Sequence, residues 1–239
     1  MLTQLLPAQV VAVEATTAPV DAMLFPEEER QIRNAVDKRR DEYTTVRWCA
    51  RRAMAEMGLP AAPVLPGLRG APQWAPSVVG SMTHCAGYRA AALAHSSDIS
   101  AIGIDAEPNE PLPEGVLEAI GLPQEVRWVR HYLRAIPGVA WDRLLFSMKE
   151  SVYKTWFPLT GREMDFEDAL ITVDPALGTF HARLLLGPAE RMEGDPRSFT
   201  GRWSAENGVL VSAIAVAAEV PAQRNAPHQV LVGSVGQVS

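Results

Sequence analysis

The sequence predicts an α+β protein built from two halves of similar architecture. Two observations carry this prediction: segments with helix and strand character follow in the order helix, strands, helices, strands, and 239 residues suffice for two small domains. We expect an N-terminal α+β half at residues 1–108, a C-terminal α+β half at 109–220 and a flexible tail at 221–239. No convincing sequence repeat relates the halves.

The first half begins with one expected strand near residues 10–13 and a helical segment at 26–57. Pro26 and the three glutamates after it suit the first turn of a helix, and Gly58 suits its end. Because this segment is long for a globular protein, we expect a break near residues 38–41. Its apolar residues recur three and four positions apart, the pattern of a buried helix face: Tyr43, Val46, Ala50, Ala53 and Met57. After a Pro- and Gly-rich loop, short strands are expected at 78–83, 89–95 and 100–107.

The second half begins with a proline-rich linker or mobile loop at residues 109–123. Helices are expected at 124–135 and 139–157, with Pro158 and Gly161 ending the second. Apolar residues of the second helix recur three and four positions apart and form one stripe: Trp141, Leu145, Met148, Val152 and Trp156. Four strands are expected after them, at 169–173, 179–186, 199–205 and 209–218. Asn207-Gly208 is a strong signal for a hairpin between the last two strands.

Composition excludes several classes of protein. A net charge of −6 disfavours a general nucleic-acid binder, which needs a basic surface. The longest apolar run, residues 209–218, is about half the roughly 20 residues of a membrane span, and the first 25 residues lack the Lys or Arg that starts a signal peptide. Two cysteines, Cys49 and Cys85, cannot form a disulfide framework or a Cys-rich zinc site. We expect a cytoplasmic monomer that binds neither nucleic acid nor membrane.

Only three of the 22 basic side chains are lysines, Lys38, Lys149 and Lys154. Glu150 and Lys154 are spaced i,i+4 on an expected helix, and a surface ion pair is the simpler interpretation. In a chain that otherwise uses arginine, a lysine can instead be kept for its compact charge or its titratable amine.

A second candidate site lies in the segment Gly103 to Pro108. Residues two apart on a strand face the same side, so Asp105 and Glu107 can direct two carboxylates to one point. Oxygen ligands of this kind suit Mg²⁺, and Glu150 could complete a site of three carboxylates. The alternative is a solvated strand end whose acidic pair has no role.

Two further segments indicate phosphate binding. His84 follows an expected strand among small residues, where a phosphate contact and a buried histidine are comparably plausible. Six basic residues against two acidic ones give residues 38–52 a local charge of +4, which indicates either a solvated helix face or a phosphate site. Arginines, carboxylates and a lysine together are typical of phosphoryl transfer on a phosphate-rich small molecule.

In this order and spacing, the segments resemble the Sfp/EntD-type 4′-phosphopantetheinyl transferases, and within them the actinobacterial branch. The resemblance rests on residues 39–52, 79–85, 102–108 and 146–154, with supporting matches at 156–158 and 165–169. It implies a pseudo-dimer of two α+β halves with the active site at their interface. It also implies transfer of 4′-phosphopantetheine from coenzyme A to a serine of an acyl or peptidyl carrier protein, with adenosine 3′,5′-bisphosphate as the other product. Such enzymes serve fatty-acid, polyketide and nonribosomal peptide biosynthesis.

The resemblance also implies roles for individual residues. Asp105, Glu107 and Glu150 would hold Mg²⁺, with Mn²⁺ as the alternative ion. Arg39, Arg47, Thr83, His84 and Lys154 would contact coenzyme A. Glu150 and Lys154 would be the catalytic residues, with Glu150 or a metal-bound water preferred as general base.

At one position the sequence departs from these relatives. Pro66 stands where they carry a loop lysine that helps to bind coenzyme A, and Arg69 is the nearest basic residue. Carrier docking is expected on the loop 109–123 and on residues 164–166. The alternatives are a metal-dependent hydrolase of coenzyme A or nucleotides, and a non-catalytic coenzyme-A-binding module.

Overall fold

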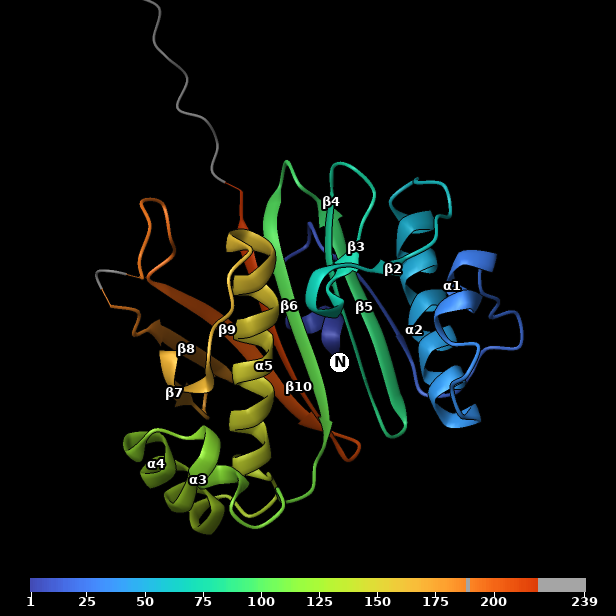
Figure 1. Ribbon diagram of the computed structural model, residues 1–239. Helices are drawn as coiled ribbons and strands as arrows, with labels where there is room; N and C mark the ends of the chain where they lie inside the picture. The colour runs from blue at the N-terminus through green and yellow to red at the C-terminus, as the bar shows by residue number, and fades with distance from the viewer. Residues whose placement is uncertain (188–189, 219–239) are drawn as a thin grey trace, which may run out of the picture.

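The computed structural model describes residues 1–187 and 190–218, so the predicted tail at 221–239 lies outside the described residues. The elements form two α+β halves, each with one long helix packed on an antiparallel sheet (Figure 1). Among the described residues, no helix combines the length and hydropathy that crossing a bilayer requires. The predicted fold class is confirmed.

The first half is a three-stranded sheet in the order β1 (Val11–Ala15), β5 (Tyr88–His95) and β4 (Val78–Cys85). Helix α2 (Asp37–Glu56) packs against this sheet through the apolar stripe predicted from the sequence. Its small buried residues, among them Ala50 and Ala53, contact Ala91 and Leu93 of β5. Short side chains on both surfaces let the helix approach the sheet closely.

The predicted break in the long helix exists but lies earlier than expected. Helix α1 (Pro26–Gln31) ends before Ile32, and α2 starts at Asp37, so residues 38–41 are helical. Ile32 turns inward and is 5% exposed, and the Arg40 guanidinium donates hydrogen bonds to the Ile32 carbonyl and to Glu29. The break therefore lies between Gln31 and Asp37, where Ile32 is buried, and not in the polar segment 38–41.

The second half is a five-stranded sheet in the order β6 (Ile99–Pro108), β10 (Val209–Ala217), β9 (Ser198–Glu206), β8 (Thr179–Leu184) and β7 (Ala169–Asp174). Helix α5 (Trp141–Thr160) covers one face, and its stripe from Trp141 to Trp156 is fully buried. Asn207 and Gly208 both have positive φ, 53° and 76°, which confirms the predicted hairpin turn.

Helix α5 continues through Pro158, which was expected to help end it, and stops at Gly161 with φ 66°. The predicted linker contains a short helix, α3 (Val116–Ile120), which precedes α4 (Pro123–Ala135). The remaining short elements are η1 (Leu2–Gln4), β2 (Leu65–Pro66), η2 (Leu68–Gly70), β3 (Pro72–Gln73) and η3 (Phe166–Asp168).

The two sheets meet along β4 and β6, which lie side by side without a backbone ladder between them. Two side chains of β4 bridge this seam instead. The Ser81 hydroxyl accepts a hydrogen bond from the Ile104 amide at 3.1 Å, and the Thr83 hydroxyl accepts one from the Ala106 amide at 2.9 Å. Strand β6 is therefore hydrogen-bonded to β10 on one side and joined to the first half through hydroxyl groups on the other.

Gly103 sets the distance between β6 and α5. A Cβ atom at this position would overlap the Ser151 carbonyl oxygen and the Thr155 hydroxyl. The absence of a side chain lets α5 cross directly over β6. Asp105, two residues after Gly103 on the strand, is thereby brought into contact with Lys154 on the helix. This contact positions the helix residues of the candidate site against the strand residues.

Candidate active site

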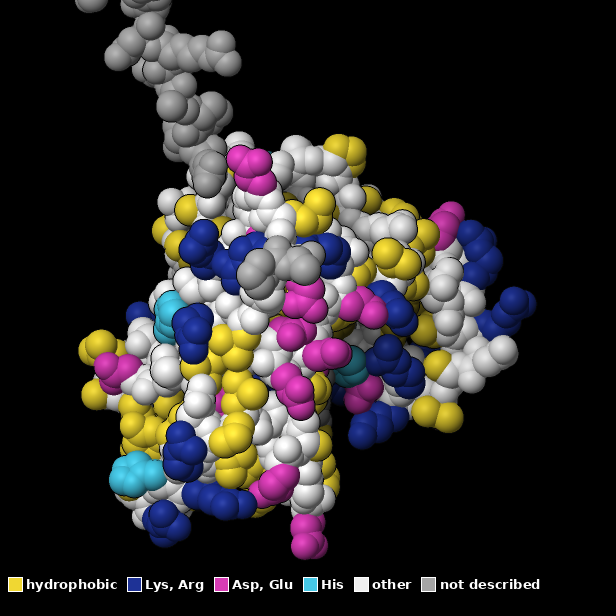
Figure 2. All heavy atoms as spheres, turned by 60° about the vertical axis from the view of Figure 1, so that its left-hand side comes forward, with side chains coloured by type: hydrophobic (Ala, Val, Ile, Leu, Met, Phe, Trp, Pro, Cys, Tyr) yellow, Lys and Arg dark blue, Asp and Glu magenta, His cyan; other side chains and the backbone are white. Residues whose placement is uncertain are grey.

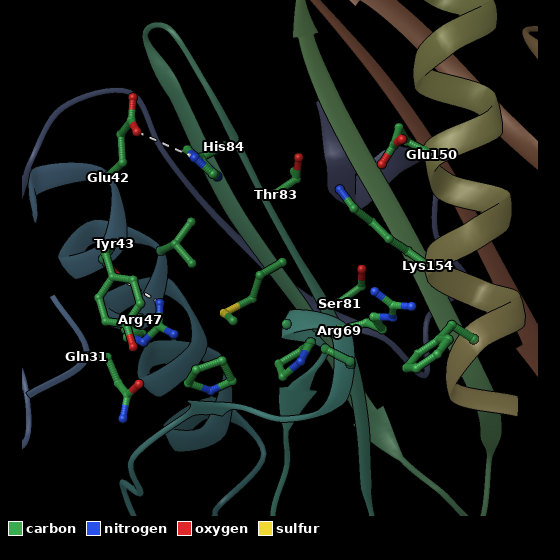
Figure 3. A pocket seen from close by; sticks show the side chains of 18 of the residues that line it. Gln31, Glu42, Tyr43, Arg47, Arg69, Ser81, Thr83, His84, Glu150 and Lys154 are labelled. Atoms are coloured by element: carbon green, nitrogen blue, oxygen red, sulfur yellow. Dashed lines mark hydrogen bonds and ion pairs between the residues drawn. The ribbon is translucent and has the colours of Figure 1, made fainter. Parts of the chain in front are cut away.

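A cavity of about 600 Å³, here called the central cavity, opens between the two halves. Helix α2, strand β4, helix α5 and the loop around η2 line it (Figure 3). The structure brings six of the predicted site residues to its wall: Arg39, Arg47, Thr83, His84, Glu150 and Lys154. The other two, Asp105 and Glu107, lie next to it on β6.

Asp105 is 4% exposed and is held by two donors from different elements. Lys154 Nζ of α5 lies 2.7 Å from Asp105 Oδ1, and the Thr83 hydroxyl donates to the same oxygen at 3.4 Å. The second carboxylate oxygen, Oδ2, is buried and has no hydrogen-bond partner among the described residues. A buried carboxylate oxygen without a donor is costly, and a bound cation would satisfy it.

Glu107 lies two residues further along β6, where Arg143 of α5 binds it at 3.0 Å. Burial raises the pKa of Glu107, and the nearby Asp105 raises it further, while Arg143 opposes the rise. Burial also raises the pKa of Glu150; Lys154 opposes this, and Asp105 and Glu107 add to it. The three predicted metal ligands therefore share one electrostatic environment.

The metal prediction can be tested against these contacts. Among the described residues, no group of three or more His, Cys, Asp or Glu side chains is close enough to hold a metal ion. Lys154 and Arg143 contribute the cations that pair with Asp105 and Glu107. The chemistry of the donors still fits Mg²⁺, because oxygen ligands are present and Asp105 Oδ2 has no hydrogen-bond partner within residues 1–187 and 190–218. The predicted ligands thus suit the ion without forming a closed site.

Three of the six basic residues at 38–52 pair with glutamates outside the segment. Glu28 is fully buried and accepts hydrogen bonds from Arg51 and from the Val64 amide, with Arg47 Nε 3.7 Å away, while Arg40 pairs with Glu29. Part of the local charge of +4 is therefore used within the protein, whereas Arg39 lines the central cavity and forms no ion pair among the described residues. Arg51 and Arg40 stabilise the N-terminal half. From the sequence alone, these two arginines could not be distinguished from phosphate-binding ones.

Arg47 lies at the cavity wall and is also held by contacts inside the first half. It lines the central cavity, yet its Nε donates to the Val64 carbonyl at 3.0 Å and its guanidinium stacks on the Tyr43 ring. Burial lowers the pKa of Arg47 to about 10, so the side chain stays cationic at neutral pH. These contacts hold the guanidinium rigidly at the cavity wall.

The two neighbouring lysines of α5 have different environments. Lys149 is 2% exposed; it pairs with the buried Glu125 at 2.8 Å and donates to the carbonyls of Phe166 and Ala169. These three acceptors match the three N–H donors of an ammonium group, so Lys149 has a structural role at this position. Lys154 instead faces the central cavity (Figure 3).

A smaller cavity of about 220 Å³ lies on the other side of Glu150. Met164, Phe166 and Ala169 give it an apolar wall. Glu150 and Tyr153 line both cavities and therefore stand between them. This arrangement gives the half-buried carboxylate of Glu150 access to two separate binding spaces.

Sequence reasoning missed two charged residues of the site, Arg143 and Glu42. Arg143 holds Glu107 and also donates to the carbonyls of Glu110 and Pro111. It lies two helical turns before Glu150, a spacing that places both on one helix face and could have indicated it. Glu42 lies 3.5 Å from His84 across the cavity, a contact between segments 42 residues apart that no local pattern indicates.

Comparison with known proteins shows the family to which the chain belongs. The family model of the 4′-phosphopantetheinyl transferase N-terminal domain matches residues 27–94, and that of the 4′-phosphopantetheinyl transferase superfamily matches residues 101–193. The chain is 53% identical over 225 residues to 4′-phosphopantetheinyl transferase Svp of Streptomyces mobaraensis, covering 91% of this chain and 90% of the relative.

Two further relatives have related names. Identity to 4′-phosphopantetheinyl transferase Npt of Nocardia iowensis is 45%, covering 91% of this chain and 100% of the relative. Identity to 4′-phosphopantetheinyl transferase PptT of Mycobacterium tuberculosis is also 45%, covering 80% and 85%. The resemblance to the actinobacterial branch is thereby confirmed. The chain belongs to the 4′-phosphopantetheinyl transferase superfamily and is an enzyme that transfers the 4′-phosphopantetheine group.

Proposed function

We propose that this transferase moves 4′-phosphopantetheine from coenzyme A to a serine hydroxyl of an apo acyl or peptidyl carrier protein within the central cavity. One observation carries the proposal: the cavity brings three cationic side chains, Arg39, Arg47 and Lys154, into the same space as the carboxylate of Glu150. Cations suit the phosphates of coenzyme A, and a carboxylate suits removal of a hydroxyl proton. The products would be holo-carrier and adenosine 3′,5′-bisphosphate.

The α2 side of the cavity suits the nucleotide end of coenzyme A. Arg39 and Arg47 would hold its 3′-phosphate, and Thr83 and His84 would face a phosphate from β4. Arg69 also lines the cavity and pairs with Glu163, which supports a role for it where relatives carry the loop lysine. The guanidinium of Arg47 is already held at the cavity wall by the Tyr43 ring and the Val64 carbonyl, so it needs little rearrangement to meet a phosphate.

The α5 side suits the pyrophosphate and the reacting serine. Asp105, Glu107 and Glu150 would hold Mg²⁺, with Mn²⁺ as the alternative ion. When bound, the metal would neutralise charge that develops on the pyrophosphate during transfer. Lys154 would add a second positive charge beside Asp105, and its fixed position limits reorganisation as that charge develops.

Glu150 is our choice for the general base. Burial raises its pKa, which makes it a stronger proton acceptor than an ordinary carboxylate. It would take the proton from the carrier serine as the serine oxygen attacks the β-phosphorus and the bond to the bridging oxygen breaks. Its position between the two cavities lets one side chain reach both a cofactor and a second substrate.

The smaller cavity and the loop after β6 suit the carrier. Met164 and Phe166 line the smaller cavity, and Arg143, which binds Glu107, also donates to the carbonyls of Glu110 and Pro111. These contacts support carrier docking on residues 164–166 and on the loop 109–123. On the face drawn in Figure 2, acidic side chains run in a column down the middle, with basic side chains on both sides of it. Monomeric state and cytoplasmic location stay predictions.

A mass-shift assay tests the proposed function. Apo carriers from fatty-acid, polyketide and peptide pathways are incubated with the protein, coenzyme A and Mg²⁺. The mass of each carrier is then measured by mass spectrometry. We expect at least one carrier to gain the mass of one phosphopantetheine group, and none to gain it with Asp105→Asn. No gain on any carrier, or steady hydrolysis of coenzyme A without a carrier, would contradict the proposal and favour the hydrolase.

A further inference from the structure

His84 lies between a cation and a carboxylate that both come from α2. Arg39 Nη1 is 2.8 Å from His84 Nε2, and Glu42 Oε2 is 3.5 Å from the same nitrogen. Figure 3 shows the imidazole and the Glu42 carboxylate directed toward one another at the cavity wall. One ring nitrogen is thus in contact with a donor and an acceptor at once.

The chemistry of these groups fixes the protonation of the imidazole. A guanidinium can only donate, so Nε2 must accept from Arg39 and carries no proton. His84 is therefore neutral with its proton on Nδ1. In this state the Glu42 carboxylate faces a second acceptor, and the contact becomes a hydrogen bond only when Nε2 is protonated.

The other charged groups around His84 favour the same neutral state. Arg89 is its pairing partner on β5, and Lys154 faces it from α5. Burial lowers the pKa of His84, Arg39 lowers it further, and Lys154 and Arg89 add to this, with Glu42 alone opposing. A neutral imidazole is what this surplus of cations requires.

An anionic ligand reverses this balance. A phosphate bound by Arg39 withdraws the guanidinium hydrogen bond from Nε2 and adds negative charge beside the ring. Nε2 then has the phosphate and Glu42 as its neighbours, both of which are acceptors. A neutral ring with its proton on Nδ1 offers neither of them a donor, whereas protonation of Nε2 places one N–H and a positive charge beside both acceptors.

We propose that Glu42 is a positioning residue for His84, and that binding of coenzyme A drives uptake of one proton from solvent by His84 Nε2. This inference rests on the proposed function, which places a cofactor phosphate at Arg39. The proton moves from bulk water to the ring, the ring becomes an imidazolium, and Glu42 remains a carboxylate throughout. The ligand that triggers the change is a phosphate ester dianion.

The neighbouring acidic residue provides a matched control. Asp41 precedes Glu42 on the same helix turn but is exposed, whereas Glu42 is 8% exposed. Asp41→Asn and Glu42→Gln remove the same charge from adjacent positions. Only Glu42→Gln removes the carboxylate that contacts His84.

The experiment measures His84 directly by nuclear magnetic resonance. Protein with ¹³C-labelled histidine is titrated from pH 5 to 9 with EDTA present, with and without saturating coenzyme A. The chain has five histidines, and His84→Asn identifies the resonance. We expect coenzyme A to raise the pKa of His84 by about one unit or more in wild type and in Asp41→Asn, and clearly less in Glu42→Gln.

The outcomes separate this inference from the proposed function. If coenzyme A shifts the histidine resonances but the pKa of His84 stays unchanged or falls, the proton uptake is wrong and cofactor binding stands. An equal rise in Glu42→Gln and wild type would remove the role of Glu42. If coenzyme A changes no resonance, the proposed function itself fails. The wild-type titration alone decides the proton uptake, even if Glu42→Gln does not fold.

Discussion

Lys154 Nζ lies 2.7 Å from Asp105 Oδ1, which joins the ammonium group of α5 to a buried carboxylate of β6 beside the central cavity. The contact exists because Gly103 lets the helix cross directly over the strand. It leaves Asp105 Oδ2 buried without a hydrogen-bond partner in the part of the chain that the structure describes. One oxygen is therefore held by protein, and the other is left for a cation.

Asp105→Asn should lower turnover by at least about 100-fold with little loss of stability. The amide keeps the shape of the side chain but supplies no negative charge to a metal ion or to Lys154. Steady-state transfer of phosphopantetheine to a carrier measures the loss, and circular dichroism with urea unfolding checks the fold. Turnover equal to wild type would remove Asp105 from the site.

Lys154→Gln should lower kcat strongly, because it removes the positive charge that faces the cavity beside Asp105. The protein should stay folded, because Lys154 lies at the cavity wall and not in the core. Lys154→Arg should retain part of the activity, since it restores charge without the compact ammonium group. The comparison of kcat and KM for coenzyme A separates the two roles. If only KM changes, Lys154 binds the cofactor in the ground state and does not stabilise the transfer step.

Lys149→Met should act on stability instead. It leaves the fully buried Glu125 carboxylate with the Leu122 and Ile171 amides as donors but without its cation, which costs about 3–5 kcal/mol. Lys149→Met with Glu125→Gln should recover much of this loss, because both charges are then gone and the amide oxygen of glutamine still accepts from a backbone N–H. Urea unfolding of the three proteins tests the expectation. If Lys149→Met alone were as stable as wild type, the buried ion pair would contribute nothing to the free energy of unfolding.

Thr83→Val and Ser81→Ala form a matched pair at the seam between β4 and β6. Each leaves one buried backbone N–H of β6 unpaired, which costs about 1–3 kcal/mol of unfolding free energy. Only Thr83→Val also removes a donor to Asp105, so only this variant should lose turnover beyond its effect on folding. Thr83→Ser should restore activity. Equal turnover in the pair would deny Thr83 a part in holding Asp105.

Gly103→Ala should destabilise the protein by about 1–3 kcal/mol, because the added methyl group overlaps Ser151 and Thr155 of α5. The helix must move away from β6, which lengthens the contact between Lys154 and Asp105. Turnover measured below the unfolding temperature should fall along with stability. Gly87→Ala offers a comparison: its Cβ would meet no neighbouring atom, although its φ of 76° carries a backbone penalty.

The sequence predicted most elements well, because their determinants are local. Apolar spacing of three and four residues fixed the buried faces of α2 and α5, and Asn207-Gly208 fixed the last hairpin. The break between α1 and α2 was misplaced because burial of Ile32, a tertiary event, determines it. The boundary at residue 108 stays a prediction, although β6 is hydrogen-bonded to the sheet of the second half.

By itself, the sequence determined which residue types are available for chemistry: strand carboxylates two apart, a helix with Glu150 and Lys154, and a basic segment in an acidic chain. Only the tertiary structure decided how each is used. Arg51 is occupied by a buried glutamate, Lys149 holds a loop, and Lys154 faces the cavity. The physical reason is that charges act over a few ångströms in space. The carboxylate that Lys154 contacts, for example, lies 49 residues away along the chain.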